Sequence, residues 1–191
     1  MAPLTDAVED SLNKIYLKDW RKMRVAVIDT ETTGLNAKEN NIVEIGIIYF
    51  EDGKPVDKYV KTFNPNFKMN PKAEAAHGIK LEDLEDSPKF NDVAIKIKKR
   101  LIDCDIWCMF NDRFDRHFIS QEFERAGVKL KHRMTIDPLI IANYIWPTGP
   151  NNLDSVIQRL RIRPDPDDLG KFELNGARHR ADYDAFLTGM V

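Results

Sequence analysis

Apolar positions in the first half of the chain are gathered in short runs rich in β-branched residues and separated by turn-forming residues, which is typical of β-strands. Strand-like runs lie at residues 24–29, 41–50 and 56–63. The segment Glu51-Asp-Gly-Lys54, between the second and third runs, is typical of a hairpin turn. Three consecutive strands with short connections predict an antiparallel meander.

Beyond residue 70 the apolar positions recur at the three- and four-residue spacing of helices, interrupted by two further strand-like runs. Asn70 followed by Pro71 marks the start of one helix, and Gly127 marks the end of another. The expected helices lie at 71–76, near 93–101, at 112–126, 139–145 and 153–160, and from 181 onward. The expected strands lie at 105–110 and 135–137, and a Pro- and Asp-rich loop lies at 163–170. This order predicts an α/β fold with a mixed five-stranded sheet, an antiparallel meander followed by parallel strands, flanked by helices.

The first 22 residues have a pattern of their own. Residues 5–22 carry Val8, Leu12, Ile15 and Tyr16 at helical spacing. We therefore expect an amphipathic helical extension at residues 1–22 and a main domain at 23–191. The apolar face of the extension has three uses open to it: packing on its own domain, which is the simplest, forming a dimer, or binding another protein.

The chain has 191 residues, enough for one domain with a substantial core. Its formal charge of −2 argues against a protein that coats duplex DNA through a broad basic face. The charge does not exclude an enzyme that holds a single strand end. At such a site, bound cations neutralise both the carboxylates of the protein and the phosphates of the substrate.

No apolar run approaches the roughly 20 residues that a membrane-spanning helix needs, and the first residues lack the basic-then-apolar layout of a secretory signal. Cys104 and Cys108, four positions apart in an expected strand, would lie too far apart for an unstrained disulfide. We therefore expect two reduced core thiols, a cytoplasmic location and no membrane partner.

A pair of acids follows the first strand-like run. Because strand side chains alternate between faces, Val25, Val27, Asp29 and Glu31 lie in one row that begins apolar and ends in two carboxylates. Two adjacent carboxylates at the end of an apolar strand are costly unless a cation lies between them, and Mg²⁺ or Mn²⁺ favours such oxygen ligands. The alternative for this pair alone is a surface turn whose acids are solvated.

Another acid, Asp115, lies near the start of the helix expected at 112–126. With Asp112 as the cap, Asp115 falls in the first turn, where the helix dipole favours a negative charge. Phe118 and Ile119, three and four positions further on, place Asp115 on the inward, apolar face, where a carboxylate needs a partner. The adjacent Phe114 offers a ring for base stacking, and its alternative is a place in the core.

A histidine and two acids occur together in the segment His179-Arg-Ala-Asp-Tyr-Asp184. Histidine exchanges protons near neutral pH, which suits a general base beside a metal site. The alternative for His179 is a solvated loop position. Spacing alone leaves open whether Asp182 or Asp184 is the ligand.

Together the three acidic segments resemble the DEDDh family of 3′–5′ exonucleases, which includes the proofreading epsilon subunit of DNA polymerase III. The run Val27-Ile-Asp-Thr-Glu-Thr-Thr-Gly-Leu35 is similar to the first motif of the family. Asn111 with Phe114-Asp115 resembles the second motif, and His179 with Asp184 has the H-x₄-D spacing of the third. Phe110 departs from the pattern, because family members often have a histidine there. The resemblance covers most of residues 24–191.

The resemblance implies a ribonuclease H-like fold and hydrolysis of terminal phosphodiester bonds at single-stranded DNA 3′ ends, with release of nucleoside 5′-monophosphates. It also implies two Mg²⁺ or Mn²⁺ ions and selects Asp184 over Asp182. His179 is the implied base for the attacking water. The implied metal ligands are Asp29, Glu31, Asp115 and Asp184, and the implied residues around the terminal nucleotide are Thr32, Gly34, Leu35, Asn111 and Phe114.

Other functions remain compatible with the sequence. A ribonuclease T-like 3′–5′ exoribonuclease would use the same carboxylates, although the first motif is closer to proofreading-type members and so favours DNA. A non-catalytic nucleic-acid-binding or partner-recruiting module would be expected to lack a carboxylate or the histidine, and none is missing. A ribonuclease H-like endonuclease generally lacks the His-x₄-Asp pairing. The expected protein partner is a polymerase or another replication or repair protein.

Overall fold

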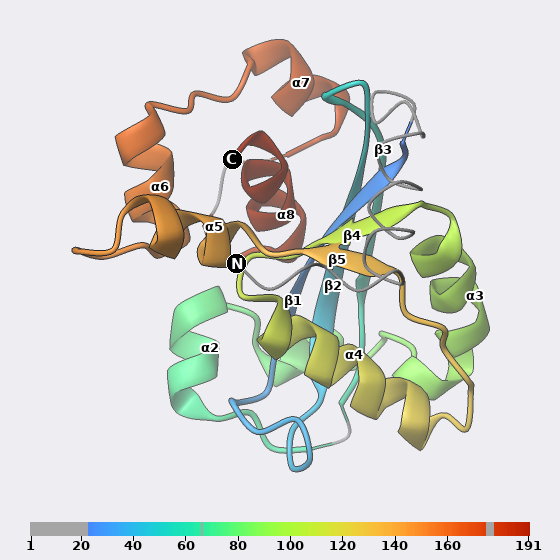
Figure 1. Cartoon of the computed structure of the whole chain (residues 1–191). Coiled ribbons are helices and arrows are strands. Elements are labelled where there is room, and N and C mark those ends of the chain that lie inside the picture. Colours follow the sequence, from blue (N-terminus) through green and yellow to red (C-terminus); the bar gives the residue numbers. More distant parts are fainter. Residues whose placement is uncertain (1–22, 66, 175–177) are drawn as a thin grey trace, which may run out of the picture.

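The computed structural model describes residues 23–65, 67–174 and 178–191, so the extension expected at residues 1–22 lies outside the described residues. A five-stranded sheet in the order β3-β2-β1-β4-β5 forms the centre of the molecule (Figure 1). β1, β2 and β3 pair antiparallel, and β4 and β5 continue the sheet parallel to β1. This confirms the expected mixed sheet. The strands are β1 (Val25–Thr32), β2 (Ile42–Glu51), β3 (Lys54–Thr62), β4 (Ile106–Cys108) and β5 (Met134–Ile136).

Helices cover both faces of the sheet (Figure 1). α3 (Phe90–Ile102) and α4 (Asp112–Arg125) pack on one face, and α8 (Ala181–Met190) packs on the other. None of the helices within the described ranges is both long and apolar enough to cross a membrane. The remaining helices are α2 (Pro71–His77) and the 3-10 turn η2 (Leu81–Leu84), which follow β3, and α5 (Pro138–Ile145), α6 (Leu153–Leu160) and α7 (Pro166–Lys171), which lie on the side of α8.

The alternation of side chains along β1 separates the two faces. Ala26 and Ile28 belong to the core beneath α3 and α4, whereas Val27 packs with residues of α8. β2 is buried at every position except its last, as expected for a strand with helices on both faces. Because Asp29 and Glu31 continue the row of Val27, they face the side of α8.

Several boundaries differ from those expected from the sequence. The segment 163–170, expected as a loop, contains most of α7, because the carboxylate of Asp165 accepts a hydrogen bond from the backbone N–H of Asp167 at 2.9 Å and Pro166 occupies the first turn. The Asp and Pro residues that suggested a loop are therefore the cap and the first turn of α7. Cys104 lies in the turn before β4 rather than in a strand, and both it and Cys108 are free thiols, as expected.

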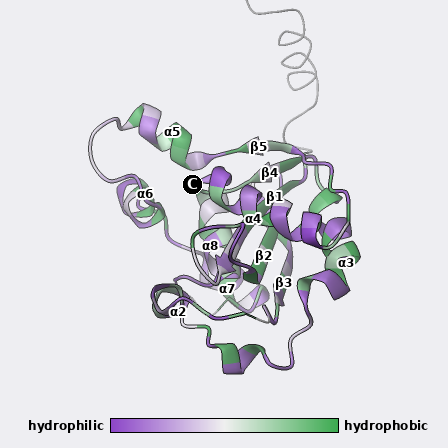
Figure 2. Ribbon diagram, turned by 90° about the horizontal axis from the view of Figure 1, so that it is seen from below, coloured by the Kyte–Doolittle hydropathy of each residue, from purple (hydrophilic) through white to green (hydrophobic). Residues whose placement is uncertain are grey.

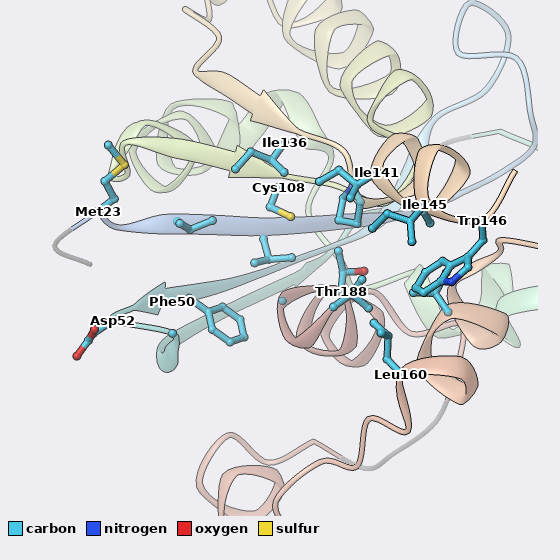
Figure 3. A pocket seen from close by; sticks show the side chains of 18 residues that line it. Met23, Phe50, Asp52, Cys108, Ile136, Ile141, Ile145, Trp146, Leu160 and Thr188 are labelled. Carbon is cyan, nitrogen blue, oxygen red and sulfur yellow. The ribbon is translucent and has the colours of Figure 1, made fainter. Parts of the chain in front are cut away.

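An apolar cavity of about 460 Å³ lies on the α8 side of the sheet (Figure 3). Its walls come from β1, β4, α5, α6 and α8, and they include Ile141, Trp146 and Leu160. Figure 2 shows that α5, which lines this cavity, is largely hydrophobic (green), whereas much of α4 is hydrophilic (purple). Met23, the first described residue, also lines this cavity.

Candidate active site

Three carboxylates meet at the carboxyl end of β1. Asp29 and Glu31 are two positions apart, so both project from the face of β1 that packs against α8. α8 carries Asp184 in its first turn, opposite this pair. One oxygen of each carboxylate lies within 4.8 Å of the other two. Oxygen donors at this separation suit a hard divalent cation.

Asp182, the other acid of α8, points elsewhere. Its carboxylate accepts a hydrogen bond from Nζ of Lys58 on β3 at 3.2 Å. Two positions along a helix rotate a side chain by roughly 200°, so Asp182 and Asp184 lie on opposite sides of α8. The structure therefore brings Asp184, and not Asp182, to Asp29 and Glu31.

A buried acid on β2 holds the start of α8 in place. Glu44 lies opposite Glu31 in the β1–β2 pairing and is fully buried. Its Oε2 accepts hydrogen bonds from Nε of Arg180 at 3.1 Å and from the backbone N–H of Ala181 at 2.9 Å, while its Oε1 pairs with Nη2 of Arg180. Sequence reasoning missed Glu44 and Arg180. The available signal was a single charged residue within the apolar run 42–50.

Gly46, two residues further along β2, allows the two backbones to touch. A Cβ at this position would lie 2.3 Å from the carbonyl carbon of Ala181, which is closer than side chains tolerate. Any larger residue would push the start of α8 away from β2. The position of Asp184 relative to Asp29 therefore depends on this glycine.

α4 supplies a fourth acid. Asp115 is 3% exposed, and its Oδ1 accepts a hydrogen bond from Oγ1 of Thr30 at 2.6 Å. Phe118 and Ile119 are buried, so Asp115 lies on the inward face of α4 as expected. It is not one of the three acids that meet within 4.8 Å, but it acts electrostatically on Asp29.

The start of α4 is held by an acid that follows β5. The carboxylate of Asp137 accepts hydrogen bonds from the backbone N–H groups of Asn111 at 2.9 Å and Asp112 at 3.0 Å. Asn111 is the residue at the N-cap and has a left-handed backbone, with φ 67°. Asparagine adopts this conformation more readily than most residues. The expectation that Asp112 caps the helix is therefore wrong.

Burial and mutual repulsion raise the pKa values of the acids. Burial raises the pKa of Asp29 well above its ordinary value, and repulsion from Asp115 and Glu31 raises it further. Burial, followed by repulsion from Glu44, raises the pKa of Glu31 to about 8. Burial also raises the pKa of Asp115 to about 7, although the hydrogen bond from Thr30 opposes the shift. A bound divalent cation would favour the charged form of each acid, so the donor set fits such an ion.

Arg178 and His179, in the loop before α8, contact Asp184. Nη1 of Arg178 contacts Oδ1 of Asp184, and its Nε pairs with Asp154 at 2.6 Å. This guanidinium places a positive charge at the acids, where a cation would act. The backbone N–H of His179 donates a hydrogen bond to Oδ2 of Asp184 at 3.2 Å, and its Nδ1 lies 4.0 Å from the same oxygen. Because 54% of the His179 side chain is exposed, solvent and substrate have access to the ring.

A hollow of about 300 Å³ holds three of the residues expected around the terminal nucleotide. Leu35, Asn111 and Phe114 line it together with residues of α4. Leu35 is 87% exposed, and the ring of Phe114 packs against Phe118 with a centroid distance of 4.9 Å. We call this space the nucleotide hollow.

Thr32 and Gly34 shape the turn before Leu35 and do not line the nucleotide hollow. Oγ1 of Thr32 is committed to the carbonyl oxygen of Gly34 at 2.7 Å. A Cβ on Gly34 would lie 2.5 Å from Oδ1 of Asn40, so a larger residue would displace this side chain from its hydrogen bonds to Thr33 and to the carbonyl oxygen of Asn36. The side chains of these two positions therefore act on the nucleotide hollow only through the turn.

Metal binding and pH should act on stability through the acids. Because folding raises the pKa of Asp29, Glu31 and Asp115, the folded state binds more protons than the unfolded state. The metal-free protein should therefore lose stability as the pH rises from about 6.5 to about 8.5. Mn²⁺ should cancel this loss and raise the melting temperature more at the higher pH. Scanning calorimetry in chelator and in Mn²⁺ measures both effects.

Two Glu→Gln variants distinguish the effect of the buried acids on the pH dependence of stability from the effect of an exposed acid. Glu31→Gln removes one raised pKa and should flatten the pH dependence in chelator. Glu51→Gln removes an exposed acid that pairs with Arg24, and it should leave the pH dependence unchanged. A melting temperature of the metal-free wild type that rises over this pH range would contradict the assignment.

Comparison with known proteins identifies the family of this chain. A family model described as exonuclease matches residues 26–191. The DNA polymerase III subunit epsilon of Buchnera aphidicola is 32% identical over 181 residues, which cover 88% of this chain and 72% of that protein. The 3′-5′ exonuclease DinG of Staphylococcus epidermidis is 31% identical over 166 residues, which cover 87% of this chain but only 17% of that protein.

Solved structures share the fold. Exonuclease X in complex with 5′ overhanging duplex DNA superimposes with a TM-score of 0.66 at 24% identity, covering 87% of this chain and 86% of the other. Exonuclease I of E. coli in complex with a dA16 oligonucleotide superimposes with a TM-score of 0.72 at 16% identity, covering 88% and 39%. At these identities the likeness concerns the fold alone, and it confirms the expected ribonuclease H-like class.

Proposed function

Because the chain belongs to the exonuclease family, we propose that it removes nucleotides from the 3′ end of single-stranded DNA by hydrolysis and releases nucleoside 5′-monophosphates. The observation that carries this proposal is the meeting of Asp29, Glu31 and Asp184 within 4.8 Å. The names of two relatives, a DNA polymerase III subunit epsilon and a 3′-5′ exonuclease, support DNA as the substrate and the direction of attack.

The acids of the site would hold two Mg²⁺ or Mn²⁺ ions. Asp29, Glu31 and Asp184 form the donor set for one ion, and Asp115, next to Asp29, contributes to the second. When bound, the ions supply charge stabilisation to the phosphoryl oxygens and a nucleophilic water at neutral pH. The protein holds the acids on a central strand and on helices whose first turns are capped, so they need little reorganisation.

His179 is the proposed acceptor of the proton from the attacking water. Its backbone is left-handed, with φ 61°, a conformation that residues other than glycine adopt at some cost in free energy. The hydrogen bond from its N–H to Asp184 holds the loop beside the acids, and the exposed ring has room to turn toward the substrate. Proton transfer by a positioned histidine suits the neutral pH range.

The nucleotide hollow is the proposed place of the terminal nucleotide. Leu35 and Phe114 present an apolar side chain and an aromatic ring between which a base can stack. Asn111 lies at the same hollow and offers its amide to the backbone of the strand. Thr32 and Gly34 contribute through the turn that presents Leu35.

The experiment that tests this function uses 5′-labelled single-stranded DNA and RNA of the same sequence, each with Mg²⁺, Mn²⁺ or chelator. We expect a ladder that shortens from the 3′ end, that disappears in chelator, and that forms faster on DNA than on RNA. A circular single strand should resist cleavage because it offers no end.

Each of the other outcomes would indicate a different function for this protein. Faster cleavage of RNA would favour the ribonuclease T-like alternative. Cleavage of the circle would indicate an endonuclease. Failure to cleave either strand in either metal would indicate a binding module in which the acids serve no hydrolysis.

For the domain organisation, we propose that residues 23–191 form the exonuclease domain and that residues 1–22 pack on it as an extension. Met23 lines the apolar cavity of about 460 Å³, and the apolar residues of 5–22 are suited to filling it. Deleting residues 1–22 should lower the melting temperature and leave cleavage intact. An unchanged melting temperature would contradict the packing.

The proposed setting is the cytoplasm, with a polymerase or another replication or repair protein as partner. The free thiols Cys104 and Cys108 fit a reducing compartment. Similarity to a polymerase subunit supports the choice of partner. Sedimentation of the protein with and without a replicative polymerase tests this association, and unchanged sedimentation would contradict it.

A further inference from the structure

Three hollows form one continuous groove along the outer face of α4. The nucleotide hollow shares Arg113 and His117 with a second hollow of about 380 Å³. The second hollow shares Ser120 and His132 with a third, of about 370 Å³. We call the second and third hollows together the α4 groove. It begins beside the nucleotide hollow and ends at the loop that follows α4.

Basic side chains dominate the α4 groove next to the nucleotide hollow. The second hollow is lined by Arg113, Arg116, His117 and His132, and by no acidic residue. All four are exposed, and among the described residues Arg113 and His117 make no side-chain hydrogen bond or ion pair. The positive charge comes from the two arginines, because burial and the neighbouring Arg116 lower the pKa of His132. Since the chain as a whole has a formal charge of −2, this positive charge is local. Such a surface attracts a polyanion.

Contacts among the protein's own side chains hold the wall of the α4 groove. The ring of His132 packs edge-on against the buried Trp107 with a centroid distance of 5.2 Å, and its Nε2 lies 3.3 Å from Oγ of Ser120. Nε of Arg116 pairs with Asp112 on the preceding turn at 3.3 Å. The loop that follows α4 is therefore held against the helix by the protein's own contacts, which reduces the entropy cost of binding a nucleic-acid strand.

We propose that the α4 groove binds the phosphates of the nucleotides on the 5′ side of the cleaved bond, an inference that rests on the proposed function. Arg113 and His117 line both the nucleotide hollow and the second hollow, so a strand that passes from one to the other meets these two side chains first. α4 has 14 residues and is about 21 Å long. The duplex rise of ~3.4 Å per nucleotide is a lower limit for an extended single strand, and part of α4 lines the nucleotide hollow, so the groove has room for fewer than about six nucleotides. At its far end the groove carries both Lys129 and Glu124, so the excess of positive charge lies in the second hollow.

The test compares a long substrate with one that cannot reach the α4 groove. For a single-stranded oligomer of about 16 nucleotides, the double variant Arg113→Gln/Arg116→Gln should raise KM about tenfold or more, because each phosphate contact contributes to affinity. The slope of log(kcat/KM) against log salt concentration should fall by about 1.4, or ~0.7 for each lost contact. Hydrolysis of the p-nitrophenyl ester of thymidine 5′-monophosphate should be unchanged in Arg116→Gln, because Arg116 lines the second hollow and not the nucleotide hollow.

Matched variants keep the test decisive. Lys96→Gln/Arg163→Gln makes the same change of charge on α3 and on the α6–α7 connection, and it should alter neither KM nor the salt slope. Arg113→Gln alone breaks no contact among the described residues and should lower the slope by about 0.7. An unchanged KM and slope in the double variant would overturn the α4 groove and leave the proposed function standing.

Two further results would also overturn the inference. An equal loss on the ester in Arg116→Gln would mean that this arginine acts at the acids rather than along the strand. A wild-type protein that cleaves neither the oligomer nor the ester would overturn the proposed function and the α4 groove with it.

Discussion

Replacing Asp29 by Asn is expected to lower kcat about a thousandfold while the fold is kept, a loss of ~4 kcal/mol of transition-state stabilisation. Asp29 belongs to the group of three acids that meet within 4.8 Å, and Asp115 lies beside it. Asparagine has nearly the same shape but is neutral, so it is a poor ligand for a divalent cation. Rates on 5′-labelled single-stranded DNA measure the effect.

The same variant should be more stable than the wild type when no metal is present. Burial and repulsion from Asp115 and Glu31 oppose the negative charge of Asp29, and the neutral amide removes this cost. The melting temperature of Asp29→Asn in chelator near pH 8 should therefore exceed that of the wild type. Opposite effects on activity and on stability are typical of an acid that is present for its ligand rather than for the fold.

Asp182→Asn is the matched control. Asp182 lies two residues from Asp184 on the same helix, but it pairs with Lys58 and points away from the site. This variant should retain nearly full activity. Activity retained in Asp29→Asn, or lost equally in Asp182→Asn, would contradict the assignment of the acids.

Replacing Glu44 by Gln is expected to lower both stability and activity, although Glu44 touches no substrate. Its carboxylate accepts hydrogen bonds from Arg180 and from the backbone N–H of Ala181 in a fully buried position. A glutamine amide turns one of these acceptors into a donor that faces another donor. We expect a loss of about 2 kcal/mol in the free energy of unfolding and a fall of about 4–8 °C in the melting temperature.

Activity should fall in Glu44→Gln because the start of α8 positions Asp184, and the loop before α8 carries His179, whose N–H bonds to Asp184. The control is Glu51→Gln, on the same strand. Glu51 also pairs with an arginine, Arg24, but its side chain is 46% exposed, so its loss should cost less than about 1 kcal/mol. Denaturant titration and steady-state rates measure the two variants side by side. Equal stability of both would show that Glu44 does not hold α8.

Much of the fold follows from local patterns in the sequence. The alternation along β1 places Asp29 and Glu31 on one face, as expected, because the period of a strand is a property of its own backbone. The helical spacing of Phe118 and Ile119 likewise places Asp115 on the inward face of α4. Capping is harder to read. Asp165 caps a helix in a segment expected as a loop, and Asp137 holds the start of a helix far from it in sequence.

The sequence by itself determined that an antiparallel meander is followed by parallel strands. It also determined which faces of β1 and α4 are buried and which acids lie on those faces. Each of these depends on dihedral angles and side-chain periods that neighbouring residues set among themselves. Spacing alone left Asp182 and Asp184 open, and the family resemblance selected Asp184. Only the tertiary structure shows how Asp184 meets Asp29, and that Glu44 and Gly46 seat the helix that carries it. These choices depend on how α8 rotates and approaches β2, which is the result of packing between segments more than 100 residues apart.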